Sequence, residues 1–406
     1  MNQGMLSVDE ALAFLLAGAK PVAETEQTAT LAACGRVLAK AQFSALNVPS
    51  VDNTSMDGYA VQSADCASGA ARLPISQRVA AGSVPLPLAR GTAARIFTGA
   101  PIPPGADAVV MQEQCAQGGE AVIIRHRPAP GEWVRRAGED IRAGSEILGT
   151  GVKLRPQDTG LAASVGISAL PIYRRLKVAV FFTGDELVMP GEPLPPGRIY
   201  NSNRFTLNAL LQMLGCEVAD FGIVPDRLEE TRAALRRAAD GNDLIITSGG
   251  VSVGEEDHIK PALEAEGKLS MWKIAAKPGK PLAFGEVGAL AGRKAHFIGL
   301  PGNPVSSFVT FIIFVRPFIL RCQGVTRVEP LAYQLRADFD WAKPDLRREF
   351  LRARLNASGG LDIYANQSSA VLTSTVWGDG LVDNPAHHPI RRGDMVKFLP
   401  FAELLR

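Results

Sequence analysis

The sequence predicts a multidomain α/β protein: a three-layer α/β domain with a parallel-rich sheet, an inserted β-rich module, a segmented helical domain and a C-terminal β domain. The chain has 406 residues, and since one domain usually holds ~150, about three domains are expected. Strand and helix patterns alternate between Lys177 and Arg321, which is typical of a parallel sheet covered by helices. Short apolar runs separated by turns fill the stretch from Phe43 to Leu148 and the stretch after Pro330.

These changes of pattern divide the chain into four parts. Residues 1–45 and 146–176 are expected to form the segmented helical domain, and residues 46–145 the inserted β-rich module. Residues 177–326 would form the α/β domain, and residues 327–406 the C-terminal β domain.

Composition indicates a folded protein without a strong overall charge. The 43 Lys and Arg nearly balance the 41 Asp and Glu, so no global field attracts nucleic acid or an anionic membrane. The longest apolar stretch, Phe308 to Val315, is interrupted by Arg316 and Pro317, well short of the ~20 residues that span a bilayer. The five cysteines form no C-x-x-C pair. We therefore expect a soluble, cytoplasmic protein with reduced thiols and with neither nucleic-acid nor membrane partners.

Helix signals flank the β-rich module. Ser7 and Glu10 fit a capping box, apolar residues then recur at helical spacing up to Leu15, and Gly18 ends the helix. A second helix is expected over residues 157–166. The β-rich module is therefore interpreted as an insertion between two parts of one helical domain.

The α/β domain contains alternating elements with clear patterns. A leucine stripe marks the first helix, and Gly215 follows it as a C-cap. The expected elements are strand Lys177–Thr183, helix Asn203–Leu214, strand Glu217–Val224, helix Leu228–Ala239 and strand Asp243–Thr247.

Three apolar strands of this domain each lead into a glycine-rich or acidic turn. In open parallel sheets the ligand crevice lies beyond the carboxyl ends of the strands, so these turns should converge. Glycine amides and helix N-termini favour phosphate, and Pro304 after an Asn N-cap suits such a helix start. The candidate substrate-binding residues on the turns are Thr183, Gly184, Ser248, Gly249, Gly250, Ser252, Gly254, Pro301, Gly302 and Asn303.

Acidic residues lie next to these turns. Asp226 follows a strand, and Glu255, Glu256 and Asp257 follow the second glycine turn. Because carboxylates repel phosphate, a bridging hard cation explains them best, and oxygen-only ligands favour Mg²⁺. Glu255 and Glu256 fit better as stabilisers of a helix N-terminus.

A basic cluster follows, with Lys273, Lys277 and Lys280 along a strand that ends in a Pro-Gly turn before Pro281. Three ammonium groups at one strand end suit a ligand with several charged oxygens, although a solvated turn is the alternative. The Asp-Gly and Gly-Glu-Asp turns of the β-rich module, and His258, His387 and His388, have no chemical assignment from the residues alone.

Together these motifs resemble the molybdopterin molybdenumtransferase family, the MoeA type, which includes the gephyrin E domain. The resemblance covers essentially the whole chain, in motif order as well as content. The motifs that carry it are Ser55–Val61, Thr98–Pro103, Gly138–Ile141, Thr183–Leu187, Ser248–Gly254, Lys277–Pro281 and Leu300–Ser306.

The resemblance implies the last step of molybdenum cofactor assembly. Molybdate and adenylated molybdopterin would be converted, with Mg²⁺, to molybdenum cofactor and AMP. The family forms an elongated homodimer, here through the segmented domain, in which the β-rich module of one subunit completes the cleft of the other. A molybdopterin adenylyltransferase would be the upstream partner.

The resemblance also implies roles for individual residues. The catalytic set is Asp57, Asp140, Glu186, Asp226, Asp257, Lys273 and Lys277, with Thr98 binding substrate and with Glu186, Asp226 and Asp257 holding the metal. The molybdate pocket is Lys277, Lys280, Pro281, Arg347 and Ser368. Two choices remain open in this pocket, since Arg348 adjoins Arg347 and a Ser-Ser pair replaces the Gly-Ser of many relatives.

Two rival functions remain at this level. A molybdopterin adenylyltransferase has a similar α/β domain, but the β-rich module and the C-terminal domain argue against it. A non-enzymatic scaffold like the gephyrin E domain would not need convergent acids and bases at strand ends. The sequence does not distinguish molybdate from tungstate.

Overall fold

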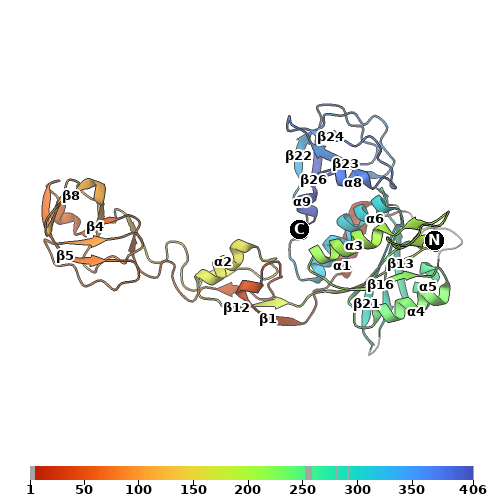
Figure 1. Cartoon of the computed structure of the whole chain (residues 1–406), viewed down its shortest axis with the longest axis horizontal. Coiled ribbons are helices and arrows are strands. Elements are labelled where there is room, and N and C mark those ends of the chain that lie inside the picture. Colours follow the sequence, from red (N-terminus) through yellow and green to blue (C-terminus); the bar gives the residue numbers. More distant parts are fainter. Residues whose placement is uncertain (1–4, 252–257, 280, 290–291, 406) are drawn as a thin grey trace.

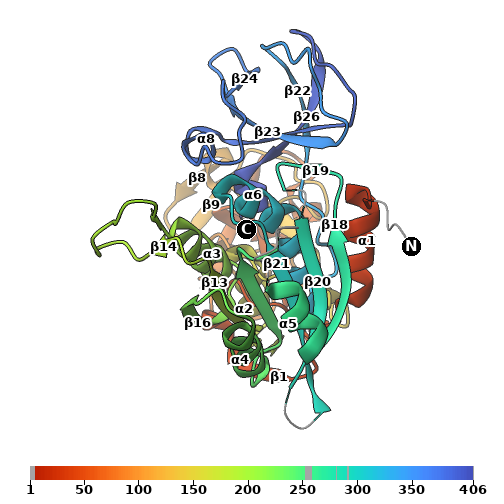
Figure 2. The same ribbon diagram turned by 90° about the vertical axis from the view of Figure 1, so that its right-hand side faces the viewer.

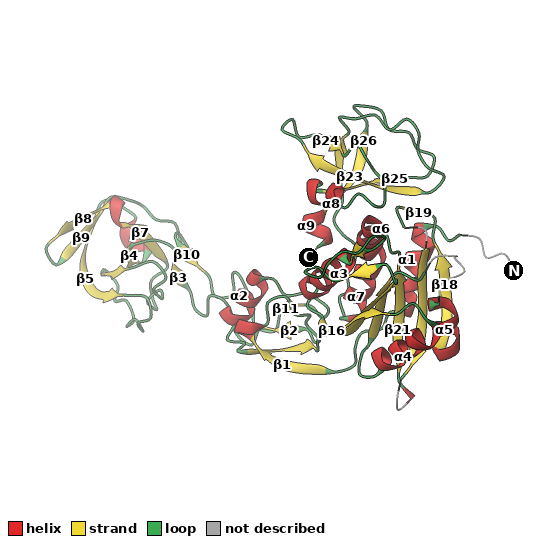
Figure 3. Cartoon of the chain, turned by 45° about the vertical axis from the view of Figure 1, so that its right-hand side comes forward, coloured by secondary structure: helices red, strands yellow, loops and turns green. Residues whose placement is uncertain are grey.

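The computed structural model describes residues 5–251, 258–279, 281–289 and 292–405. The chain is elongated (Figure 1). The β-rich module lies at one end, the α/β domain at the other, and residues around helix α2 (Pro156–Ser164) lie between them. The C-terminal β domain packs beside the α/β domain (Figure 3). The predicted multidomain α/β architecture is confirmed.

Helix α1 (Val8–Gly18) begins with the predicted capping box. The Ser7 amide donates to Glu10 Oε2 at 2.8 Å, and the Glu10 amide donates to Ser7 Oγ at 3.2 Å. Its buried face packs against helix α7 (Arg316–Cys322) in the core of the α/β domain. This helix therefore belongs by packing to the α/β domain, although the sequence placed it in the helical segment.

The segment around α2 contains less helix than expected. Two antiparallel two-stranded sheets accompany α2, and their members pair β1 with β12 and β2 with β11. The strands are β1 (Thr25–Ala29), β2 (Gln42–Phe43), β11 (Glu146–Leu148) and β12 (Ala169–Tyr173). They are short, and β1 is mostly exposed, so the period-two apolar signal of a strand is missing there.

The β-rich module is built on a six-stranded sheet with the order β7-β4-β6-β5-β9-β8. Apolar clusters cover both faces of this sheet. Its strands are β4 (Gly58–Val61), β5 (Ala71–Val79), β6 (Ala93–Ile96), β7 (Ala108–Met111), β8 (Cys115–Gly118) and β9 (Ala121–Ile124), and β3 (Asn53–Thr54) pairs separately with β10 (Val134–Arg135).

The α/β domain has a six-stranded sheet with the order β16-β13-β17-β21-β20-β18. The first four strands in this order run parallel, β20 runs antiparallel to β21, and β18 runs antiparallel to β20. The strands are β13 (Lys177–Thr183), β16 (Glu217–Val224), β17 (Leu244–Ser248), β18 (Gly267–Lys273), β20 (Pro281–Gly288) and β21 (Lys294–Leu300), while β14 (Leu187–Val188) and β15 (Ile199–Tyr200) form a small parallel pair.

Helices cover both faces of this sheet (Figure 2). Val178, Val180 and Phe182 of β13 join the cluster beneath α1, α7, α3 (Ser202–Met213) and α6 (Pro304–Thr310). Ala179 and Phe181 face the opposite cluster, beneath α4 (Leu228–Ala239) and α5 (Ile259–Glu266). Both faces of β13 are buried, so it reads as a continuous apolar run.

One helix of the described residues, Pro304–Cys322, is long and apolar enough by composition to cross a membrane, but 89% of its most apolar stretch is buried in the protein. It forms the central core helix of the α/β domain. A π-helical turn (Phe311–Val315) precedes Arg316 and Pro317, and the helix continues through these two residues, which end the apolar stretch in the sequence. The buried Arg316 guanidinium donates to the carbonyls of Val328 and Glu403, at 3.1 Å each.

The C-terminal domain has a sheet with the order β19-β23-β25-β26-β22, and β24 pairs with β23. Its elements are β22 (Tyr333–Arg336), β23 (Arg348–Leu355), β24 (Leu361–Ile363), α8 (Thr373–Trp377), β25 (Gly380–Asn384), β26 (Met395–Pro400) and α9 (Phe401–Leu404). Its edge strand β19 (Ala276–Lys277) comes from the α/β region and pairs in parallel with β23, with Lys277 opposite Glu349. This pairing ties the two domains together at the lysine cluster.

Candidate functional site

A cavity of about 1010 Å³ lies at the carboxyl ends of β13, β17 and β21. The α/β domain supplies the turns that follow these strands, β19 supplies Lys277, and the C-terminal domain supplies Arg347 and residues 367–370. The predicted site residues that line it are Thr183, Gly184, Glu186, Asp226, Ser248, Gly249, Gly250, Lys277, Pro281, Pro301, Gly302, Asn303, Arg347 and Ser368.

The second glycine turn needs glycine for steric reasons. Gly249 has φ +98°, and a Cβ built on it would lie 2.3 Å from the carbonyl oxygen of Thr183. Gly250 has φ +63°, and its Cβ would lie 2.7 Å from Thr183 Oγ1. The turn therefore packs directly on the end of β13, where only a residue without a side chain fits.

Side-chain hydrogen bonds tie the three turns together. Asn203 Nδ2 donates to Ser248 Oγ at 2.9 Å and to the Gly302 carbonyl at 2.7 Å. Ser248 Oγ donates to the Pro301 carbonyl at 3.0 Å. The floor of the cavity is thus braced before any ligand binds.

Two buried polar atoms in the cavity lining have no hydrogen-bond partner among the described residues. They are Thr183 Oγ1 and Asn201 Nδ2, and the two residues are 3% and 2% exposed, respectively. Buried polar groups are nearly always paired, so these two suit a bound polar ligand. Asn201 was missed because the helix was expected to begin at Asn203. Its N-cap position, where Oδ1 accepts the Arg204 amide at 3.1 Å, was the available signal.

Two of the three expected metal-binding carboxylates line the cavity, Glu186 and Asp226. Asp257 lies outside the described residues, as do Ser252, Gly254, Glu255 and Glu256. Among the described residues no group of three or more His, Cys, Asp or Glu side chains is close enough to hold a metal ion. Two carboxylates still fit Mg²⁺, which proteins commonly bind through one or two carboxylates, substrate phosphates and water.

The lysine cluster differs from the prediction. Lys273 ends β18 in the α/β sheet and does not line the cavity, whereas Lys277 lies in β19 of the C-terminal sheet. The expectation that one strand end concentrates both ammonium groups is therefore wrong, because the chain changes sheets between them. Lys280 lies outside the described residues.

Lys277 and Arg347 share a carboxylate partner that the sequence did not identify. Lys277 Nζ lies 3.2 Å from Asp345 Oδ2 and 3.2 Å from Glu349 Oε1. Arg347 Nε donates to Asp345 Oδ1 at 2.9 Å, and its Nη2 donates to Oδ2 at 3.2 Å. The hydrogen bonds from Arg347, joined by one from Lys277, hold the pKa of the Asp345 carboxyl well below its usual range. Asp345 is therefore a carboxylate at neutral pH.

A loop of the C-terminal domain closes the cavity beside α6. Asn303 occupies the predicted N-cap position of α6, with Pro304 in its first turn, but its side chain makes no capping bond. Its Nδ2 donates instead to Ser369 Oγ at 3.2 Å. The buried Arg352 supports the loop from behind by donating to the Ser368 carbonyl at 3.3 Å. Both serines of the Ser-Ser pair line the cavity.

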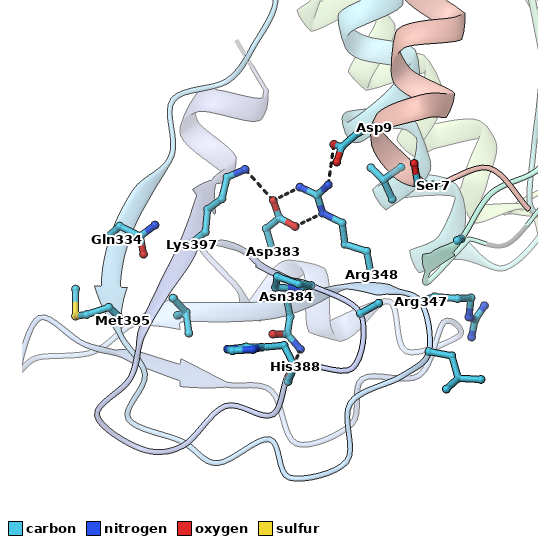
Figure 4. Close-up of a pocket in the computed structure, with 16 residues that line it drawn as sticks. Ser7, Asp9, Gln334, Arg347, Arg348, Asp383, Asn384, His388, Met395 and Lys397 are labelled. Atoms are coloured by element: carbon cyan, nitrogen blue, oxygen red, sulfur yellow. Dashed lines mark hydrogen bonds and ion pairs between the residues drawn. The ribbon is translucent and has the colours of Figure 1, made fainter.

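Arg348 belongs to a different cluster from Arg347. A second pocket, of about 570 Å³, lies between α1 and the C-terminal sheet. Figure 4 shows Arg348 reaching to Asp383 and Asp9 while Arg347 points away. Arg348 Nη1 donates to Asp9 Oδ1 at 2.8 Å, and Lys397 Nζ lies 3.0 Å from Asp383 Oδ2. Of the two candidate arginines, only Arg347 lines the larger cavity.

The predicted site residues of the β-rich module lie far from the cavity within one chain (Figure 1). Thr98 donates to Asp57 Oδ1 through both its amide and its hydroxyl, at 2.7 Å each. These bonds lower the pKa of the Asp57 carboxyl. Asp140 is exposed on a turn, where its amide donates to the Val48 carbonyl at 3.0 Å. A single chain does not bring Asp57, Thr98 and Asp140 to the cavity.

Known proteins resemble this chain along almost its whole length. Residues 6–166 match the MoeA N-terminal region (domain I and II), residues 179–321 a probable molybdopterin binding domain, and residues 334–401 the MoeA C-terminal region (domain IV). A molybdopterin molybdenumtransferase from Haemophilus influenzae is 39% identical, covering 99% of this chain and 100% of that protein. One from Synechococcus elongatus is 38% identical, covering 92% and 93%.

Solved structures agree with the sequence matches. A molybdopterin biosynthesis MoeA protein from Pyrococcus horikoshii is 30% identical and superposes with a TM-score of 0.80, covering 98% of this chain and 99% of that chain. A second structure of a MoeA protein from that organism gives a TM-score of 0.84 at 26% identity, covering 98% and 100%. The chain belongs to the molybdopterin molybdenumtransferase family.

Proposed function

We propose that this protein inserts molybdate into adenylated molybdopterin and releases AMP, forming molybdenum cofactor in an Mg²⁺-dependent reaction. The observation that carries the proposal is one cavity lined by glycine turns, two carboxylates, a lysine and an arginine. Backbone amides and two unpartnered polar atoms suit phosphate oxygens, while the lysine and arginine suit a tetrahedral oxyanion.

Each group then has a distinct role. The turns at Gly249 and Gly302 orient the phosphates, and Lys277, Arg347 and the Ser368–Ser369 pair hold molybdate beside them. Glu186 and Asp226 would hold Mg²⁺, together with Asp257. When bound there, the ion would supply positive charge to the phosphate link, which stabilises the departing AMP. Holding both reactants in one cavity makes their encounter intramolecular.

The proposal extends to the assembly. The protein acts as a cytoplasmic homodimer, in which Asp57, Thr98 and Asp140 of one subunit complete the cavity of the other. The separation between the β-rich module and the cavity within one chain supports this arrangement. A molybdopterin adenylyltransferase supplies the adenylated substrate.

The test is AMP release by purified protein supplied with adenylated molybdopterin, molybdate and Mg²⁺. We expect AMP and cofactor in equal amounts, and much less AMP when molybdate or Mg²⁺ is left out. Absence of molybdate-dependent AMP release would refute the proposed reaction. Consumption of ATP with free molybdopterin would instead indicate an adenylyltransferase.

A further inference from the structure

Among the residues that the structure describes, two cations line the cavity, Lys277 and Arg347, and both are bound to one carboxylate that does not itself line it. Asp345 accepts two hydrogen bonds from Arg347, at 2.9 and 3.2 Å, and its Oδ2 lies 3.2 Å from Lys277 Nζ. Some of the hydrogen-bond donors of both cations are therefore already engaged before a ligand binds in the cavity.

The charges of this cluster cancel. Lys277 and Arg347 are positive, and the carboxylates of Asp345 and Glu349 are within ion-pair distance of them. An oxyanion entering the cavity thus meets a cluster with no net charge. Its attraction to the two cations is offset by repulsion from the carboxylates.

The two carboxylates are not equivalent. Glu349 has no exposed surface, and its Oε2 accepts Trp341 Nε1 at 2.8 Å and the Asp345 amide at 3.1 Å. It is an internal part of the C-terminal sheet. The Asp345 side chain is 21% exposed and lies before β23, so its charge can be removed without leaving a fully buried group unpaired.

We propose that Asp345 sets the oxyanion affinity of the cavity: its carboxylate aligns Lys277 and Arg347 and at the same time cancels part of their charge. The inference rests on the proposed function, because it takes these two cations as the oxyanion contacts. The attenuated charge keeps common anions such as inorganic phosphate and sulfate from filling the cavity. Neutralising Asp345 should make the cavity bind oxyanions more tightly.

The test compares molybdate binding by equilibrium dialysis, in the intact protein, for the wild type, Asp345→Asn and Asp345→Ser. Both variants remove the charge, and asparagine keeps an acceptor for Arg347. We expect molybdate to bind about tenfold more tightly to Asp345→Asn, with a steeper loss of affinity as salt is raised. Inorganic phosphate should also bind more tightly to both variants than to the wild type.

Asp338 offers a matched control. It accepts Arg336 Nε at 2.8 Å and Nη2 at 3.1 Å, repeating the Asp345–Arg347 arrangement in the same domain but away from the cavity. Asp338→Asn should bind molybdate as the wild type does. A merely structural role for Asp345 would leave molybdate binding by its variants unchanged or weaker.

The outcomes separate the two proposals. Unchanged or weaker binding in both Asp345 variants, in folded protein, would overturn the inference, as would no detectable binding in either variant. If binding is unchanged in the Asp345 variants but lost in Lys277→Ala, the oxyanion site is at Lys277 as proposed and Asp345 does not set its affinity. If the Asp345 variants bind molybdate more tightly but no variant releases AMP, the inference stands and the proposed reaction is wrong.

Discussion

The ammonium group of Lys277 lies 3.2 Å from Oε1 of Glu349, a side chain with no exposed surface. The two residues face each other across the β19–β23 pairing, which joins the α/β region to the C-terminal sheet. A lysine that lines the cavity thus also neutralises a buried carboxylate. Any change at Lys277 should therefore affect stability as well as oxyanion binding.

Lys277→Ala should raise the molybdate concentration for half-maximal activity roughly 10–100-fold, because one charge-assisted contact is worth about 1.5–3 kcal/mol. It should also lower the free energy of unfolding by about 2–3 kcal/mol, because Glu349 loses its cation. Adding Glu349→Gln should restore much of the stability but not the molybdate response. Recovery of both in the double variant would make the role of Lys277 purely structural. Denaturant unfolding and AMP assays measure the two effects.

Gly249→Ala should destabilise the protein and abolish most activity. The new Cβ would approach the Thr183 carbonyl at 2.3 Å, in a backbone conformation with φ +98°. Gly241→Ala is the matched control, since Gly241 has φ +80° with nothing within 4 Å of its Cβ position. The free energy of unfolding of the control should fall by only about 1 kcal/mol, because of backbone strain, and the control should keep its activity. Equal losses of activity in both variants would contradict a specific role for the turn.

The loss of stability in acid should depend on His296. Its ring stacks on Phe284 and packs edge-on against Phe318. Burial lowers the pKa of the His296 imidazole. The unfolded chain therefore takes up a proton that the folded chain resists, so the His296 contribution to stability is present above about pH 6.5 and is lost below it. His296→Phe keeps an aromatic ring and should lose less Tm than the wild type between pH 7.5 and pH 5.5. The same loss of Tm in both proteins would contradict this assignment.

If each cavity is built from both subunits of the proposed dimer, two inactive variants should restore activity when their chains form mixed dimers. Asp140 lies in the β-rich module and Glu186 in the α/β domain, so in a mixed dimer of Asp140→Asn and Glu186→Gln chains both defects fall in one cavity and the other cavity is intact. With random exchange half of the dimers are mixed, each with one good site of two, so about a quarter of wild-type activity should return. No recovery after verified exchange would indicate that each cavity is built from one chain or that the two cavities are interdependent.

Much of the α/β domain could be predicted because its central strands, such as β13 and β17, are buried on both faces. Strands β13 and β16 and helix α4 begin and end at the predicted residues. The convergence of the three turns followed from parallel topology alone. The two small sheets around α2 had no comparable signal, because their strands are short and β1 is mostly exposed.

The charged part of the cavity was less predictable. Asp345 and Glu349 meet Lys277 only because a two-residue strand crosses into the sheet of another domain. Such a pairing, between residues about seventy positions apart, has no local pattern in the sequence. Asn201 could not be identified for a different reason, since the sequence pattern fits a helix that begins at Asn203, one residue after the observed start at Ser202.

The most direct test is a crystal structure of the protein soaked with molybdate and AMP, with molybdenum located by anomalous diffraction. We predict a molybdenum peak between Lys277, Arg347 and the Ser368–Ser369 pair, and the AMP phosphate at the Gly249–Gly250 turn. A molybdenum peak elsewhere, with this cavity empty in the soaked crystal, would contradict the account.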